Sequence, residues 1–209
     1  MELIRLCNSR LDDLRNRYSE KHRHYHALHH IGHMLNHFDQ VSHLINNPVA
    51  VSFAIWYHDA IYDPTRKDNE LRSADLFIEH HESYLSIYMQ GYVVDLILAT
   101  ITHTLPTLKT FDFNNDCALF LDLDLASLGA PWKDFHQNTN DIRKEYLFVS
   151  EEDFNQGRGR ILDNFLSRDP LYFSPYFQNY FHDSARRNLK RSVKLLTGKT
   201  SNKFPWITI

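Results

Sequence analysis

Apolar residues recur at three- and four-residue spacing along most of the chain, a period typical of amphipathic α-helices. Short segments in which apolar and polar residues alternate, the pattern of half-buried strands, are scarce. Only 6 glycines and 7 prolines interrupt the helical pattern. The sequence therefore predicts an all-α fold, a single-domain helical bundle.

Turn and cap residues set the expected helix bounds. Gly91 is expected to separate two helices, Asp68 to cap one, and Gly129, in a left-handed conformation, to end another. The segment 49–62 is apolar nearly all round, so we expect it at the centre of the bundle. The predicted helices cover residues 3–17, 25–45, 49–62, 69–82, 92–104, 114–129, 132–149, 151–167 and 182–197.

Length and charge narrow the class of protein. A chain of 209 residues, 43% hydrophobic and 23% charged, suits one globular domain over residues 1–209 and excludes disordered and fibrous classes. Acidic residues number 26 and basic residues 23, with no long block of either sign. We therefore expect no nucleic acid duplex as a partner.

The few cysteines and the lack of long apolar stretches indicate the cell compartment in which the protein is expected. Cys7 and Cys117 are too few for a disulfide framework. The first twenty residues lack the apolar core of a secretory signal, and no stretch approaches 18 uncharged apolar residues. We expect a cytoplasmic protein with no membrane partner, and the sequence leaves its oligomeric state open.

Histidine is the most unusual feature of the composition. There are 14 histidines, six of them in KHRHYHALHHIGH. At about 100° per helical residue, His26, His30, His33 and His37 share one stripe. Neutral imidazoles on such a stripe can bind a metal, but a solvated, histidine-rich surface has the same pattern.

The pair His58-Asp59 lies in the most apolar part of the chain. A buried carboxylate beside a buried imidazole is costly unless both are compensated, and a divalent cation compensates both. Adjacent helical residues diverge by about 100°, so both reach one ion only near a helix end. The break at residues 62–64 supplies that end. The alternative is a carboxylate in an ordinary buried hydrogen bond.

Asp122 and Asp124 are embedded in the otherwise apolar segment LDLDLASLG. Two positions apart on a helix, they point about 200° from each other, so only one is expected to be a ligand. A salt-bridged core carboxylate is the alternative for either residue.

Together these motifs resemble the HD superfamily of metal-dependent phosphohydrolases, and more narrowly its family of predicted metal-dependent phosphohydrolases. The resemblance extends from about residue 18 to about residue 190. It is carried by RHYHALHHI (23–31), WYHDAIYDPTRKDNELRSA (56–74), FLDLDLASLG (120–129) and IRKEY (142–146).

The resemblance implies an HD-type helical bundle that holds one divalent metal ion. The implied ligands are His30, His58, Asp59 and Asp124. Asp122 is the second choice for the last ligand, and His26 is a neighbour that contacts substrate or replaces a ligand. Mixed nitrogen and oxygen ligands suit Mn, Fe, Co, Ni, Zn or Mg, and the sequence does not distinguish among them.

The implied reaction is hydrolysis of a phosphomonoester bond in a nucleotide or another small phosphorylated metabolite. The ion acidifies a water and binds a phosphoryl oxygen. Asp59 and Glu70 are the expected catalytic residues, although Glu70 equally suits a helix N-terminus. The expected substrate-binding residues, for which loop charges or structural ion pairs are the alternative, are His26, Arg23, Arg66, Lys67, Asn69 and Arg143.

Two other functions fit the same motifs. A binding module would hold a nucleotide or phosphorylated metabolite in the same pocket without turnover. An oxygenase with two irons would need further ligands from His103, His80 or His81.

Overall fold

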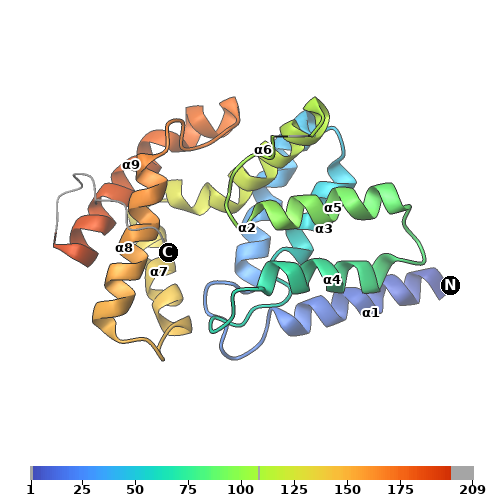
Figure 1. The fold of residues 1–209 in the computed structure, drawn as a ribbon, viewed down its shortest axis with the longest axis horizontal. Helices are drawn as coiled ribbons and strands as arrows, with labels where there is room; N and C mark the ends of the chain where they lie inside the picture. The colour runs from blue at the N-terminus through green and yellow to red at the C-terminus, as the bar shows by residue number, and fades with distance from the viewer. Residues whose placement is uncertain (1, 108, 199–209) are drawn as a thin grey trace. The chain divides into compact units, whose positions relative to one another are not determined.

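The computed structural model describes the backbone of residues 2–107 and 109–198, and the side chains of residues 9–107 and 109–198 (Figure 1). Within this part the regular elements are all helices, which confirms the predicted all-α fold. The side chains of Leu3, Leu6 and Cys7 and the tail 201–209 lie outside the described residues. No helix of the described part is both long enough and apolar enough to cross a bilayer.

Nine α-helices and two short 3-10 helices make up the described part. In chain order they are α1 (Glu2–Arg17), α2 (Leu28–Val41), η1 (Ser42–Leu44), α3 (Pro48–Tyr57), α4 (Asn69–His81), α5 (Ile87–Ala99), α6 (Phe111–Leu125), η2 (Ala126–Gly129), α7 (Trp132–Glu145), α8 (Glu151–Ser167) and α9 (Pro175–Thr197).

The chain divides after Leu125 into two compact units. The first unit contains α1 to α6, and the second contains η2 and α7 to α9. The single domain expected over residues 1–209 stays a prediction.

Helix α3 forms the centre of the first unit. Pro48 occupies its first turn, and the side chain of Asn47 accepts a hydrogen bond from the backbone N–H of Ala50 at 3.1 Å. The helix packs against α2, α4, α5 and α6, and Val51 and Ile55 are completely buried. This confirms the central position that its apolar sequence predicts.

Several predicted helix ends are wrong. Helix α2 begins at Leu28, so His26 lies outside it and does not share a helical stripe with His30. Gly91 lies inside α5, which begins after Ser86, whose side chain caps the N-terminus. Helix α3 ends at Tyr57, five residues before the predicted end.

A buried carboxylate ties three parts of the first unit together. Asp116 on α6 is fully buried and accepts hydrogen bonds from the backbone N–H groups of Asn46 and Asn47, both at 2.7 Å. The hydroxyl of Tyr92 on α5 donates a third bond at 2.9 Å. The negative charge is therefore compensated by a built set of donors, as burial requires.

We expect Asp116→Ala to lower the free energy of unfolding by about 3 kcal/mol. The two backbone N–H groups and the Tyr92 hydroxyl each lose their acceptor, at about 1–3 kcal/mol for a group that stays out of contact with water. Water can reach the donors near Asn46, which is exposed, and this reduces the cost. Urea denaturation followed by circular dichroism measures the change. Asp112→Ala, an exposed position on the same helix, is the control, and an equal loss there would contradict the role of Asp116.

In the second unit, α9 packs against α8 and η2. Gly129 ends η2 where α9 passes closely: a Cβ atom added there would lie 2.8 Å from Cβ of Phe181 and 3.0 Å from its carbonyl oxygen. The backbone of Gly129 is not left-handed, in contrast to the prediction, whereas Gly198, which caps α9, has a φ of 67°. Gly129 is thus required by close packing.

We expect Gly129→Ala to destabilise the protein by about 1–3 kcal/mol, because the methyl group overpacks against a backbone carbonyl that moves only with α9. Gly157→Ala is the matched control, since nothing lies within 4 Å of a Cβ atom added at that position of α8. There the change should stabilise by up to about 1 kcal/mol. Thermal unfolding of both variants tests the contrast, and equal melting temperatures would contradict it.

Candidate metal centre

Three buried or nearly buried side chains from different helices of the first unit converge. His30 lies in the first turn of α2, His58 caps the C-terminus of α3, and Asp124 lies in the last turn of α6. One ligand atom from each of them lies within 4.8 Å of the others. Within the described residues, this is the one group of three or more His, Cys, Asp or Glu side chains with such spacing.

The candidate ligand atoms of this group lie within ion-pair distance of each other. Oδ1 of Asp124 lies 3.1 Å from Nε2 of His30 and 3.7 Å from Nε2 of His58. Both Nε2 atoms are buried and form no hydrogen bond, although each lies 3.1 Å from a carboxylate oxygen. Because buried polar atoms nearly always find a partner, two such atoms aimed at one carboxylate oxygen fit a site for a cation. Imidazole and carboxylate together suit a divalent transition metal.

A backbone contact sets the tautomer of His58. Its Nδ1 lies 3.0 Å from the carbonyl oxygen of Ile55, and a carbonyl can only accept, so Nδ1 carries a proton. In the neutral ring the lone pair therefore lies on Nε2, the atom that faces Asp124. Metal-binding histidines commonly have their other ring nitrogen fixed in this way.

Asp59 lies beside the group of three but outside it. Its Oδ2 is 3.1 Å from Nε2 of His58. Because α3 ends at Tyr57, His58 and Asp59 lie in a turn, where neighbouring side chains can face the same side. His58 and Asp59 could bind one ion only near a helix end, and α3 does end beside them, at Tyr57 and not at residue 62 as predicted. That Asp59 is the fourth ligand stays a prediction.

The structure favours Asp124 over Asp122. Asp122 is completely buried on α6 and does not belong to the converging group. The second oxygen of Asp124, Oδ2, lies 2.8 Å from Nε2 of His103. One carboxylate oxygen is thus held by His103 while the other faces His30 and His58.

His103, which the sequence offered as a core histidine or as a further ligand of a two-iron centre, lies at this site. Its backbone is left-handed, with a φ of 50°, which is unfavourable for a residue with a Cβ atom. A strained backbone conformation persists only where surrounding contacts hold it in place. At His103 it occurs together with the contact between its ring and Asp124. No local pattern signals this contact, which joins residues 21 positions apart.

The histidines and carboxylates of the site stabilise each other's charged forms. Burial alone would lower the pKa of His58, but the carboxylates of Asp59 and Asp124 raise it to about 9. Burial would raise the pKa of Asp124, but His103, His30 and His58 hold it well below its usual value. Without a metal, the site is therefore a protonated imidazole between two carboxylates.

Arg23 braces the turn that carries His58 and Asp59. Its guanidinium donates hydrogen bonds to the carbonyl oxygens of Asp59 at 2.6 Å and Ala60 at 2.9 Å, and its Nε donates to Glu20 at 2.9 Å. The side chain is 1% exposed. This corrects the prediction of a phosphate contact, because the guanidinium is buried and committed to backbone carbonyls.

Two other predicted substrate contacts are engaged within the loop between α3 and α4. The guanidinium of Arg66 forms a double ion pair with the carboxylate of Asp68, at 2.7 and 2.5 Å. The side-chain amide of Asn69 accepts from the backbone N–H of Asp63 and donates to its carbonyl, which closes the loop. Asn69 thus has a structural role in place of the predicted substrate contact.

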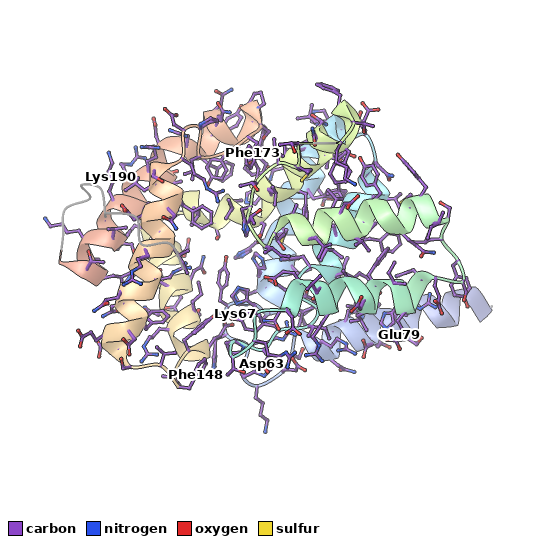
Figure 2. The ribbon with its side chains drawn as sticks, in the orientation of Figure 1. Asp63, Lys67, Glu79, Phe148, Phe173 and Lys190 are labelled. Atoms are coloured by element: carbon purple, nitrogen blue, oxygen red, sulfur yellow. The ribbon has the colours of Figure 1, made fainter. Side chains whose placement is uncertain are left out.

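Lys67 and Glu70 keep their predicted roles as hypotheses. Lys67 is exposed on the same loop, and Figure 2 marks its position and that of Asp63. Glu70 is half-buried in the first turn of α4, where its charge also suits the helix N-terminus. Asp68 precedes that helix as predicted, but its side chain makes no cap hydrogen bond because it binds Arg66.

The remaining histidine candidates have other partners. His26 stacks on Tyr62, with ring centroids 4.2 Å apart, and its ring lies 6.4 Å from that of His30. His80 and His81 both contact the hydroxyl of Tyr57, at 2.9 and 3.1 Å. His80 and His81 therefore do not join the converging group, which leaves His103 among the three further ligands suggested for a two-iron centre.

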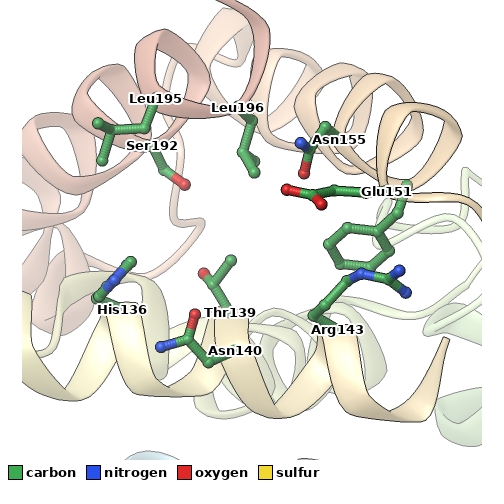
Figure 3. Close-up of a pocket in the computed structure, with 10 residues that line it drawn as sticks. His136, Thr139, Asn140, Arg143, Glu151, Asn155, Ser192, Leu195 and Leu196 are labelled. Atoms are coloured by element: carbon green, nitrogen blue, oxygen red, sulfur yellow. The ribbon is translucent and has the colours of Figure 1, made fainter. Parts of the chain in front are cut away.

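Arg143 belongs to the second unit. Its guanidinium donates to the carbonyl oxygens of Tyr146 and Val149 and lies over the ring of Phe154. It also lines a cavity of about 320 Å³ between α7, α8 and α9 (Figure 3). These hydrogen bonds join Arg143 to carbonyls and not to the acidic partner of the alternative, so its predicted contact with phosphate stays a prediction.

Comparisons of the chain with protein-family models, with curated proteins and with solved structures found no match. The functional interpretation therefore depends on the geometry of the site and on the motifs.

Proposed function

We propose that the chain is a metal-dependent phosphohydrolase of the HD type. Its substrate would be a phosphomonoester of a nucleotide or another small phosphorylated metabolite. The observation that carries the proposal is the convergence of His30, His58 and Asp124, with both Nε2 atoms buried beside carboxylate oxygens. The motif order, a histidine, then His-Asp, then a distant aspartate, supports it.

The residues of the site suit this chemistry. His30, His58, Asp59 and Asp124 would hold one divalent ion, which when bound supplies Lewis acidity that acidifies water and offsets charge on a phosphoryl group. Mixed nitrogen and oxygen ligands fit several divalent ions. His103 and the carbonyl of Ile55 orient two of the ligands, and Arg23 holds the turn that carries two. Glu70 would accept the proton of the attacking water.

The test is phosphate release by the purified full-length chain. A panel of nucleotides and simple phosphomonoesters is incubated with Mn²⁺, Co²⁺ or Mg²⁺, and bound metal is counted by emission spectroscopy. We expect one ion per chain and turnover of at least one substrate class. Asp59→Ala should abolish turnover, and Glu70→Gln should lower it by about 10²–10⁴-fold, the usual contribution of a general base.

Asp39→Ala is the matched control, because Asp39 is an exposed aspartate on α2 outside the site. Turnover that survives Asp59→Ala would contradict the proposal. Tight nucleotide binding without turnover would assign a binding module, and two ions per chain with oxygen consumption would assign a two-iron oxygenase.

A further inference from the structure

A second group of histidines lies on the solvent-exposed face of α2. His29 and His33 are both exposed, whereas His30 between them is 3% exposed and faces the candidate metal centre. The predicted stripe of His26, His30, His33 and His37 does not include His29. The structure thus separates the histidines of this helix into a buried ligand candidate and an exposed pair.

The geometry of the exposed pair suits a shared ion. His29 and His33 are four residues apart, so their Cβ atoms lie on one face of the helix, about 5–6 Å apart in such pairs. Their ring centroids are 6.1 Å apart and the ring planes are 78° apart. With metal–nitrogen distances of about 2.0–2.1 Å, two imidazoles on adjacent turns can bind one ion after small side-chain rotations. Both rings are reached from solvent.

We propose that His29 and His33 form a second, surface metal site that binds Zn²⁺, Ni²⁺ or Cu²⁺. Both protein ligands are imidazole nitrogens, which these ions accept readily, and water would complete the coordination. Mn²⁺ and Mg²⁺ prefer oxygen ligands and find none supplied by this pair. The buried centre differs because it includes carboxylates. The proposal does not depend on the phosphohydrolase function.

His37, on the next turn, is the competing partner for His33. After burial, the positive charge of His33 is the second cause that lowers the pKa of His37, which shows that the two rings are close. His37 is half-buried, whereas His29 is exposed and its ring contact with His33 is direct. The exposed pair is therefore the better site for an ion that arrives from solvent.

The experiment measures metal stoichiometry by equilibrium dialysis of the full chain at pH 8 with Zn²⁺ and, separately, with Mn²⁺. We expect two Zn²⁺ and one Mn²⁺ per chain. His29→Gln/His33→Gln should bind one Zn²⁺ and keep its Mn²⁺. Asp124→Ala should lose the Mn²⁺ and keep one Zn²⁺. Each single glutamine variant should weaken the surface site for Zn²⁺ by more than tenfold.

His43→Gln/His136→Gln is the matched control, since it removes two exposed histidines that lie on different helices. It should keep both Zn²⁺ ions. A double variant of His29 and His33 that still binds two Zn²⁺ would overturn the proposal. The proposal would also be overturned if His33→Gln and His37→Gln each lost the second Zn²⁺ while His29→Gln kept it, because the ion would then be bound by His33 and His37. If the buried centre binds no metal, the wild-type chain will bind one Zn²⁺ and no Mn²⁺. The His29→Gln/His33→Gln variant will then bind neither ion.

Discussion

Replacing Asp124 with alanine is expected to lower the affinity for Mn²⁺ by more than about 100-fold. Loss of an outer partner of a metal ligand typically costs 10–100-fold, and Asp124 is proposed as a ligand itself. Its Oδ1 is the atom on which the Nε2 atoms of His30 and His58 converge. Without it, the buried His30 loses the carboxylate that faces it, and only Asp59 is left beside His58.

Isothermal titration calorimetry with Mn²⁺ measures this loss, and graded variants locate it. His103→Gln should cost only about 10–100-fold, because His103 touches the other oxygen of Asp124 and orients it. Asp112→Ala, exposed on the same helix, should leave the affinity unchanged. Asp124→Asn keeps the shape of the side chain and removes its charge, so it should also bind weakly if the fold is intact. Equal affinity in Asp124→Asn and wild type would refute the assigned site.

The helical period predicted the fold class and the central helix, but it could not place the ends of helices that tertiary contacts decide. Proline at position 64 suggested that α3 continues to residue 62. The carbonyl oxygens of Asp59 and Ala60 instead accept hydrogen bonds from Arg23, 36 and 37 residues away. A contact of that sequence separation leaves no trace in the local pattern.

The same distinction applies to the candidate site. The resemblance to the HD superfamily selected His30, His58 and Asp124, which the structure brings together. Residue chemistry alone had left His30 among four histidines and Asp124 open against Asp122. Helical geometry showed that only one of Asp122 and Asp124 could take part, and the orientation of α6 in the fold decided which. His103 joins the site through a left-handed residue beyond the end of α5, which periodicity does not predict.

The arginines show a further limit of sequence reasoning. A guanidinium in a sequence motif suits a phosphate as well as it suits a set of carbonyls. Only the fold shows that Arg23 is buried against the turn of residues 58–60 and that Arg143 holds the C-terminal end of α7. Both guanidinium groups thus bind backbone carbonyls, whereas Arg66 and Lys67 are exposed cations of the loop after α3.

The affinity for metal should rise about tenfold per pH unit between pH 7 and 9 and then level off. In the metal-free site the carboxylates of Asp59 and Asp124 raise the pKa of His58 to about 9, although burial opposes them. A metal binds only the neutral ring, so below pH 9 each bound ion must displace one proton from His58. The pKa values of both carboxylates are lowered, so they stay ionised over this range and add no slope.

Calorimetric titration with Mn²⁺ in buffers of different ionisation enthalpy counts the proton released at pH 7.5, and we expect about one per ion. Asp59→Asn removes the neighbour that raises the pKa of His58 most, so proton release at this pH should fall well below one. The metal-free protein gives an independent check. A pKa raised above the unfolded value stabilises the fold below about pH 6.5, and that stability is lost as the pH rises through 9. Metal affinity that is constant from pH 7 to 9 would show that His58 is already neutral, and would contradict the ion pairing described for this site.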